Sequence, residues 1–249
     1  MAEKTSDIYP HFVVENNKKP NRLFAFPVIG IIIKMILLIP VFIEMFFLAI
    51  ASGFLLLINW FVVLFSKTYW DTAYRFFLGL MRLTAKTKLY LFGLTDKYPW
   101  FGLDTNGICT LDIPKPEKSN IWLAIPLLGF LVRFVLLIPY LIFSEVLNRG
   151  SGIALIMSWF AVTFKKIFPE SLYEFERDTL RVEFAADAYL IGLSDTYPSF
   201  AISMNHQTIK ILLIIAGAIL FAWSASMPSP TNDRASYQND YQYNRSNSI

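Results

Sequence analysis

Apolar residues in this chain gather in long uninterrupted runs, and these runs predict its main structural elements. The first run extends from Leu23 to Phe65 and the second from Trp122 to Phe164. A bilayer core about 30 Å thick is crossed by roughly 20 apolar helical residues, so each run has about twice the length of one crossing. The pattern therefore predicts a membrane protein built mainly from helices, and the 55% hydrophobic composition agrees with it.

The two runs are copies of one sequence, because they align without a gap at an offset of 99 residues. Leu37-Leu38-Ile39-Pro40 matches Leu136-Leu137-Ile138-Pro139, and the match continues into polar sequence. There Leu-Thr-Asp-Lys-Tyr-Pro, ending at Pro99, matches Leu-Ser-Asp-Thr-Tyr-Pro, ending at Pro198. The chain is thus a tandem duplication, and we define module 1 as residues 20–104 and module 2 as residues 120–204.

The remaining segments complete the predicted domain organisation. Residues 1–19 form a polar N-terminal tail with a short extended piece at 9–14, and residues 105–119 form a linker. Residues 101–104 and 108–113 flank Thr105-Asn106-Gly107 and predict a β-hairpin. A further apolar run at 208–227 predicts a C-terminal transmembrane helix. Residues 228–249, rich in Ser, Asn, Tyr and Gln, are expected to be disordered.

Each module is predicted to be a helical hairpin followed by an interfacial amphipathic helix. The second copy contains Asn-Arg-Gly-Ser-Gly, a strong turn signal, so we expect the hairpins to turn at 51–53 and 148–152. The helix after each hairpin ends at a Gly followed by Asp-x-Tyr-Pro. In the first of these helices Arg75, Arg82 and Lys86 share one side, as in helices that bind membrane surfaces; the alternative is a plain solvated charged face. The fold class is therefore an all-α membrane protein with minor strands in its cytoplasmic connections.

Charged residues within the apolar runs are candidate functional positions. A charge at mid-membrane costs at least about 2.5–3.5 kcal/mol, so we expect Lys34 to lie shallow, with its ammonium at the headgroups. Arg133 occupies the matched position in module 2. Glu44 and Glu145 are the acidic counterparts. Glu44 belongs to a permeation path, pairs within the helix bundle, or lies near the outer mouth of the bundle.

The distribution of Lys and Arg predicts the orientation of the chain. These residues concentrate in the N-terminal tail and between the two hairpins, whereas the hairpin turns contain only Arg149. Cytoplasmic segments carry the excess of positive charge. We therefore expect a multi-pass protein of the plasma (inner) membrane with an odd number of crossings. Its N-terminus is then cytoplasmic and its C-terminal tail lies outside.

Charge differences between the matched helices predict how the modules meet. Glu174 replaces Arg75, Asp178 replaces Gly79, and Arg181 keeps the charge of Arg82. We expect the modules to be related by a pseudo-two-fold axis along the membrane normal. Arg75 and Arg82 would then face Glu174 and Asp178. A second acidic row is expected to point to water or to a basic partner; it comprises Glu176, Glu183 and Asp187.

At the paired Leu-Leu-Ile-Pro and Asp-x-Tyr-Pro motifs, the chain resembles a prokaryotic family of membrane proteins catalogued as domain of unknown function 4389. The resemblance covers residues 21–103 and 120–202 and implies a multi-pass bacterial membrane protein, often built of tandem copies. Family members often carry His after the Ile-Pro, where this chain has Val41 and Tyr140. Any role of that His therefore does not transfer to this chain.

No motif in the sequence indicates catalysis, a metal or a cofactor. His11, His206 and Cys109 are isolated, and phosphate-binding glycine loops and zinc motifs are absent. Asp96 and Asp195 each precede a Tyr-Pro pair, Tyr98-Pro99 or Tyr197-Pro198. They cap the preceding helix or the turn, or else form a shared acid–base or ion site.

We therefore expect a non-enzymatic scaffold or accessory subunit whose partners are membrane lipid and either another membrane protein or a second copy. The alternative is a small transporter or channel of two parallel repeats, with Lys34, Glu44 and Arg133 along its path. A third hypothesis, a membrane enzyme acting on lipid, would need Asp96 and Asp195 with Arg82 and Arg181. Nucleic-acid binding is not expected, because the net charge is only +3 and no basic cluster is interleaved with aromatic residues.

Overall fold

The computed structural model of the protein describes residues 9–14, 20–21, 29–104, 107–116, 125 and 127–227. Within these residues the chain forms six helices and two short strands, which confirms the mostly helical fold class. In chain order they are β1 (His11–Val14), α2 (Ile29–Leu37), α3 (Ile39–Ser66), α4 (Asp71–Phe92), β2 (Cys109–Asp112), α5 (Leu128–Lys165), α6 (Glu170–Leu190) and α7 (Gln207–Ser226). The predicted C-terminal tail and the ends of the predicted linker lie outside the described residues.

Three helices are long and apolar enough to cross a membrane, namely α3, α5 and α7. At 1.5 Å per residue, the 38 residues of α5 extend about 57 Å. This length exceeds a hydrocarbon core of about 30 Å, so α5 cannot stand upright within it. The apolar C-terminal helix expected from the sequence is α7, a candidate span of 20 residues.

Each module is a helical hairpin, but its turn lies after the long helix and not within it. Lys67 and Lys166, which match at the repeat offset, end α3 and α5 in the left-handed conformation with φ of 59° and 56°. The polar helices α4 and α6 then pack against the long helices. The turns expected at 51–53 and 148–152 are wrong, because both stretches are continuous helix.

The Ile-Pro motif marks the other irregular point of each long helix. Proline lacks the N–H that an interior helical residue donates to the fourth preceding carbonyl. In module 1, Leu38 separates α2 from α3 and Pro40 lies in the first turn of α3. In module 2, Pro139 stays inside α5. The Ile-Pro motif therefore separates two helices in module 1, whereas in module 2 it lies within one continuous helix.

The two strands pair with one another and place a pseudo-two-fold axis between the modules. In this antiparallel ribbon Phe12 pairs with Leu111, which is its own equivalent at the offset of 99 residues. The neighbouring pairs, Val13–Thr110 and His11–Asp112, exchange under the same operation. The hairpin expected between 101–104 and 108–113 is wrong, because β2 pairs with β1. The extended piece expected near the N-terminus is confirmed at His11–Val14.

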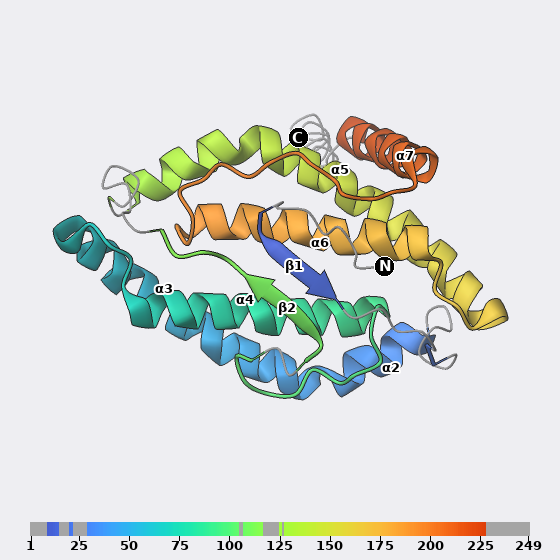
Figure 1. The fold of residues 1–249 in the computed structure, drawn as a ribbon, viewed down its shortest axis with the longest axis horizontal. Helices are drawn as coiled ribbons and strands as arrows, with labels where there is room; N and C mark the ends of the chain where they lie inside the picture. Colours follow the sequence, from blue (N-terminus) through green and yellow to red (C-terminus); the bar gives the residue numbers. More distant parts are fainter. Residues whose placement is uncertain are drawn as a thin grey trace, which may run out of the picture.

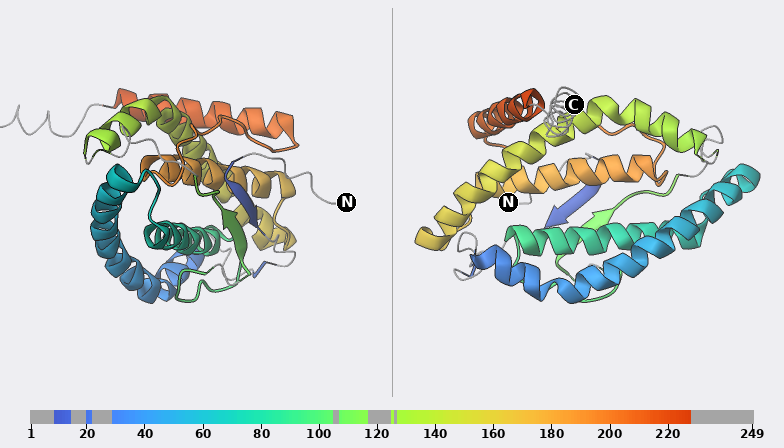
Figure 2. Two further views of the ribbon diagram at one scale, coloured as in Figure 1. Left: turned by 60° about the vertical axis from the view of Figure 1, so that its left-hand side comes forward. Right: turned by 180° about the vertical axis from the view of Figure 1, so that it is seen from behind.

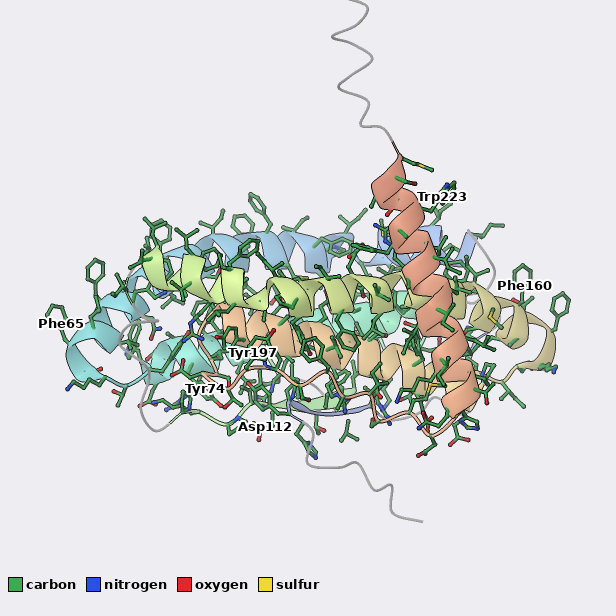
Figure 3. The ribbon with its side chains drawn as sticks, turned by 90° about the horizontal axis from the view of Figure 1, so that it is seen from above. Phe65, Tyr74, Asp112, Phe160, Tyr197 and Trp223 are labelled. Carbon is green, nitrogen blue, oxygen red and sulfur yellow. The ribbon has the colours of Figure 1, made fainter. Side chains whose placement is uncertain are left out.

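The ribbon lies between the two polar helices, and the long helices lie outside them (Figure 1). In that view α4 and α6 run in opposite directions, as a two-fold axis along the line of sight requires. Figure 2 shows from behind that α2 and α3 flank one side of the molecule and α5 the other. In Figure 3, α7 crosses α5, and Trp223 lies on the opposite side of the molecule from Asp112.

The main hydrophobic core fills the space around the ribbon. Phe12 of β1 makes an edge-on contact with Phe184 of α6, with ring centroids 5.5 Å apart. Tyr74 Oη donates a hydrogen bond to Ile113 O at the end of β2, and its equivalent Tyr173 donates to Val14 O at the end of β1. Each strand is thus held by the equivalent tyrosine of one module. The tyrosine of module 1 binds β2 and that of module 2 binds β1.

Candidate functional site

The strongest candidate site is a cation clamp that occurs once in each module. Lys34 of α2 and Arg133 of α5 are matched residues, and they are only 2% and 4% exposed. Each side chain lies near the C-terminal end of the polar helix in its own module. A helix C-terminus presents free carbonyls and a partial negative charge, and so stabilises a cation. The expectation that Lys34 reaches the headgroups is therefore wrong, because this helix end provides the compensation inside the protein.

Arg133 makes the more extensive of the two clamps. Its Nη1 donates to Tyr189 O at 2.8 Å and to Ser194 O at 3.1 Å, and its Nη2 pairs with Asp195. The guanidinium also lies 5.2 Å from the centroid of the Tyr189 ring. Charge-assisted bonds of this kind are about twice as strong as neutral ones. Arg133 therefore ties the apolar helix α5 both to the end of α6 and to the Asp-x-Tyr-Pro motif.

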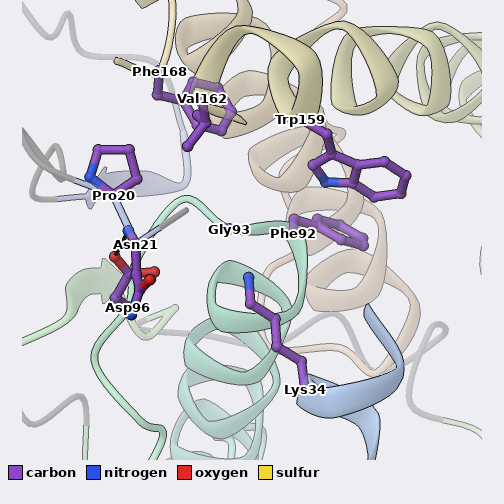
Figure 4. A pocket seen from close by; sticks show the side chains of 9 residues that line it. All are labelled: Pro20, Asn21, Lys34, Phe92, Gly93, Asp96, Trp159, Val162 and Phe168. Carbon is purple, nitrogen blue, oxygen red and sulfur yellow. Dashed lines mark hydrogen bonds between the residues drawn. The ribbon is translucent and has the colours of Figure 1, made fainter. Parts of the chain in front are cut away.

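Lys34 repeats this arrangement with a simpler side chain. Its Nζ lies 5.4 Å from the centroid of the Tyr90 ring and would be 3.3 Å from a Cβ on Gly93. Figure 4 shows Lys34 reaching from α2 towards Gly93, with Asp96 beside Asn21. Asp96 Oδ2 accepts a hydrogen bond from Asn21 N at 2.8 Å.

The cavity next to Lys34 is too small for an organic ligand. Its volume is about 10 Å³, enough for about one water molecule. Trp159, Val162 and Phe168 of module 2 line it together with Lys34 and Asp96 of module 1. The clamp of module 1 therefore lies where the two modules meet, and its geometry suits holding them together better than binding a substrate.

The tyrosines of the Asp-x-Tyr-Pro motifs reach back to the Ile-Pro motifs. Tyr98 Oη donates to Leu37 O at 2.9 Å, and Tyr197 Oη donates to Leu136 O at 3.3 Å. Both carbonyls lie three residues before the proline, next to the carbonyl that receives no helical hydrogen bond because proline lacks an N–H. The prolines that follow the tyrosines, Pro99 and Pro198, are buried. The two signature motifs are thus parts of one structural contact, repeated in each module.

Removing these hydroxyl groups should cost a moderate amount of stability. Tyr98→Phe and Tyr197→Phe each remove a hydrogen bond to a helix carbonyl, and a typical intramolecular hydrogen bond contributes about 0.5–1.5 kcal/mol. Because the two sites are in different modules, the losses should add in the double variant. Thermal unfolding of the purified protein in detergent tests this. Three variants as stable as the wild type would show that the contact contributes nothing.

One carboxylate oxygen of Glu44 is bonded by a loop of its own module, whereas Oε2 is buried without a hydrogen-bond partner among the described residues. Its Oε1 accepts a hydrogen bond from Gly102 N at 2.9 Å. Lys86 lies close by and donates to the carbonyls of Trp100, Gly102 and Asp104. Burial lowers the pKa of Lys86, while Glu44 and Asp104 act to raise it. In module 2 these positions are Phe143 and Ala185, and Phe143 contacts Phe200 instead.

The predicted basic face of α4 is mostly committed to internal contacts. Lys86 is fully buried, and Arg82 Nε donates to Leu111 O of β2 at 3.0 Å. Only Arg75 is exposed. Glu145, the remaining candidate charge of the apolar runs, pairs with Arg149 one turn later on α5 at 2.8 Å. The lipid-facing role of α4 and α6 therefore stays a prediction, and in α4 it now depends mainly on Arg75.

The expected ion pairs between Arg75 or Arg82 and the acidic residues of α6 are wrong. Glu174 accepts hydrogen bonds from Asn205, and Asp178 accepts one from Ser203 N at 2.6 Å. Arg181 Nη2 donates to Ala201 O at 2.9 Å. These residues of α6 therefore fasten the segment that leads to α7. The ribbon between α4 and α6 explains why the two charged faces do not meet there.

The polar helices α4 and α6 do form one ion pair, but it joins other residues than those expected. Lys88 of α4 pairs with Glu183 of α6, and their side chains are 27% and 29% exposed. Glu183 thus finds the basic partner expected for its row. Glu176 of the same row is fully buried instead, because Ser151 of α5 donates a hydrogen bond to its Oε2 at 2.5 Å. The sequence pattern does not indicate this buried contact, because it predicts a turn at Ser151.

Glu176 should make stability depend on pH. Burial raises the pKa of its carboxyl from 4.5 to about 8, and the Ser151 hydrogen bond acts against that shift. The folded protein therefore keeps a proton that the unfolded chain releases, so stability should fall as the pH rises from about 4.5 to about 8. Glu176→Gln should remove this part of the slope and be more stable than wild type at pH 8–9. Unfolding midpoints across pH 5–9 test this.

Glu170→Gln is the matched control, because Glu170 is exposed at the start of the same helix. It should leave the pH profile unchanged. Parallel profiles for wild type and Glu176→Gln would contradict the assignment.

The described part of the chain contains no group of three His, Cys, Asp or Glu side chains that could hold a metal ion.

Comparison with known proteins gives one family match. A family model described as a domain of unknown function matches residues 29–102 and again residues 128–201. No curated protein and no solved structure matches the chain. The two matched regions begin at α2 and near the start of α5, and each ends after an Asp-x-Tyr-Pro motif.

Proposed function

Because the chain belongs to the family of domain of unknown function 4389, with one copy in each module, we propose that it is a non-enzymatic scaffold or accessory subunit of a membrane. The observation that carries this proposal is that the buried cationic side chains contact helix ends and loops of the protein itself. Lys34, Arg133 and Lys86 hold helix ends and loops. Charges used in this way stabilise a shape and are not poised to react.

The outer faces of the long helices support the membrane location. Large apolar side chains recur along α3 at the spacing of one helical face, and an isolated soluble protein rarely exposes an apolar patch of this extent. The exposed members on α3 are Ile39, Phe42, Ile43, Phe46, Phe47, Ile50, Phe54, Leu57, Ile58, Phe61 and Phe65. A comparable face continues along α5. We propose that these faces contact the lipid chains.

The proposed orientation places the ribbon and the polar helices at the cytoplasmic side of the plasma membrane. The positive-inside rule supports this placement, and the membrane normal would follow the pseudo-two-fold axis. α7 then crosses from the cytoplasmic side, since it runs across α5 towards the side opposite the ribbon (Figure 3). The long helices would lie strongly tilted or along the membrane.

Cysteine labelling in intact cells tests this topology. With Cys109→Ser as background, Lys97→Cys and Thr196→Cys provide exposed positions beside the two Asp-x-Tyr-Pro motifs. Tyr241→Cys provides one in the C-terminal tail, outside the described residues. An impermeant reagent should label position 241 at once, and positions 97 and 196 only after permeabilisation. Labelling of position 97 in intact cells would overturn the orientation.

Flux measurements distinguish the scaffold from the transporter. Proteoliposomes containing the full chain should conduct ions no faster than empty vesicles, because Lys34, Glu44 and Arg133 have partners in separate loops and helix ends. Cross-linking in native membranes should in turn recover a defined membrane protein or a second copy. A flux that Glu44→Gln abolishes, with the protein still accumulating, would favour the transporter and overturn the scaffold.

A further inference from the structure

An open groove of about 530 Å³ lies where α5, α6 and α7 meet. This volume falls in the range of small-molecule sites, about 300–1,000 Å³. Phe134, Ile138 and Ile142 line it from α5, and Phe221 lines it from α7. Glu183 and Asp187 line it from α6. The groove therefore combines an apolar wall with a carboxylate-bearing wall, which is the division found in an amphiphilic ligand.

Two polar groups of the groove have no partner among the described residues. Ser144 is 7% exposed as a residue and lines the groove, and its hydroxyl has no hydrogen bond to any described residue. Because Ser144 lines the groove, a ligand bound there can reach its hydroxyl. Asp187 forms no ion pair, whereas Glu183 pairs with Lys88 and Glu145 with Arg149. The groove thus keeps one acceptor carboxylate and one hydroxyl unengaged.

The apolar wall continues into the face of α5 that we propose to contact lipid chains. Phe134, Ile138 and Ile142 belong to both surfaces, because each is exposed and each lines the groove. An acyl chain could therefore enter the groove from the bilayer without crossing water. This continuity identifies the membrane, and not the aqueous phase, as the source of the ligand.

We propose that this groove binds one phospholipid with a primary ammonium headgroup, such as phosphatidylethanolamine. The ammonium would bind Asp187 and Glu183, Ser144 would donate to the phosphate or ester oxygens, and an acyl chain would lie along Ile138 and Ile142. The inference rests on the proposed membrane location but not on the scaffold role.

The charges of the groove favour a primary ammonium over other lipid headgroups. An ammonium group offers three donors, which carboxylates can accept, whereas the trimethylammonium of phosphatidylcholine offers none. Three carboxylates against two cations leave the groove net negative, so anionic headgroups are repelled. Asp187 is exposed at the groove surface, but desolvation by the protein around it and the neighbouring Glu183 raise the pKa of its carboxyl to about 6, while Lys88 acts in the opposite direction. Asp187 is therefore ionised at neutral pH and available to the ammonium.

The repeat provides a natural negative control within the same chain. At the positions of Ser144, Glu145 and Asn148, module 1 has Met45, Phe46 and Ala49. At the positions of Glu183 and Asp187 it has Thr84 and Lys88. Module 1 therefore keeps the apolar wall but none of the acceptors, so the specific lipid site should belong to module 2 alone.

Lipid retention by the purified full chain tests the proposal. The protein would be equilibrated in detergent with an equimolar mixture of phosphatidylethanolamine, phosphatidylcholine and phosphatidylglycerol, and bound lipid measured by native mass spectrometry. Wild type should retain about one phosphatidylethanolamine, preferred by about tenfold, which corresponds to about 1.4 kcal/mol. Asp187→Asn should abolish the preference. Ile138→Trp, which fills the groove, should abolish retention, whereas the matched Ile39→Trp in module 1 should not.

Equal retention of the three lipids by wild type would overturn the proposal and indicate unspecific lipid around the helices. So would an unchanged preference in Asp187→Asn with Ile138→Trp still binding. Thermal unfolding of each variant shows whether it still folds. The two variants change different walls of the groove, so if one fails to fold, the other still tests the proposal. A lipid preference without the predicted labelling topology would leave the groove intact and contradict only the proposed orientation.

Discussion

Arg133→Ala is expected to destabilise the protein by about 3–5 kcal/mol, the usual cost of breaking a buried ion pair by removing one partner. The substitution leaves Asp195 without its cation and frees the carbonyls of Tyr189 and Ser194 at the end of α6. Thermal or denaturant unfolding in detergent should show the loss directly. We also expect more rapid proteolysis near residue 195, since the loop loses its attachment to α5.

Two further variants show whether the loss comes from the clamp itself. Arg133→Lys introduces the residue that module 1 uses at position 34, so it should recover part of the stability while losing the fork-shaped donor set of arginine. Arg149→Ala removes a cation whose ion pair is 42% exposed on both sides, and it should cost only about 0.3–0.5 kcal/mol. A loss from Arg133→Ala as small as that from Arg149→Ala would contradict the clamp.

Gly217→Ala should displace α7 from α5, although alanine is the better helix former. A Cβ at this position would lie 2.2 Å from Val146 O and 2.9 Å from Gly150 N, and neither backbone atom can turn away. Overpacking of this kind costs about 1–3 kcal/mol, more than the gain in helix propensity of up to about 1 kcal/mol. Unfolding in detergent and protease cleavage at residues 200–206 should both report the weakened docking.

Gly152→Ala and Gly53→Ala are the matched controls. Both glycines lie in long helices, and a Cβ at either position meets nothing within 4 Å. Each control should therefore stabilise the protein by up to about 1 kcal/mol through helix propensity alone. If Gly217→Ala behaved like these two variants, the close crossing of α5 and α7 would be wrong.

The sequence by itself determined the duplication, the mostly helical membrane-like architecture and the C-terminal apolar helix. These features depend on composition and periodicity summed over 20 or more residues, where the preference of any one residue matters little. It also singled out Lys34 and Arg133, and the two Asp-x-Tyr-Pro motifs, because they recur at one offset. The same offset relates Phe12 to Leu111, so the ribbon was detectable in principle, but a match of a few residues is a weak signal.

Tertiary structure decided what each of these residues contacts. Gly150 and Ser151 read as a turn, yet they lie in a helix, because α7 approaches the glycine and Glu176 accepts from the serine. Lys34 was expected at the headgroups, but the end of α4 offers it a partner inside the protein. The free-energy cost of burying a polar residue can be offset by several different partners, and which partner is available depends on elements distant in the chain. Periodicity in the sequence identifies a helix. Only tertiary packing determines which helix face or which free carbonyl contacts its side chains.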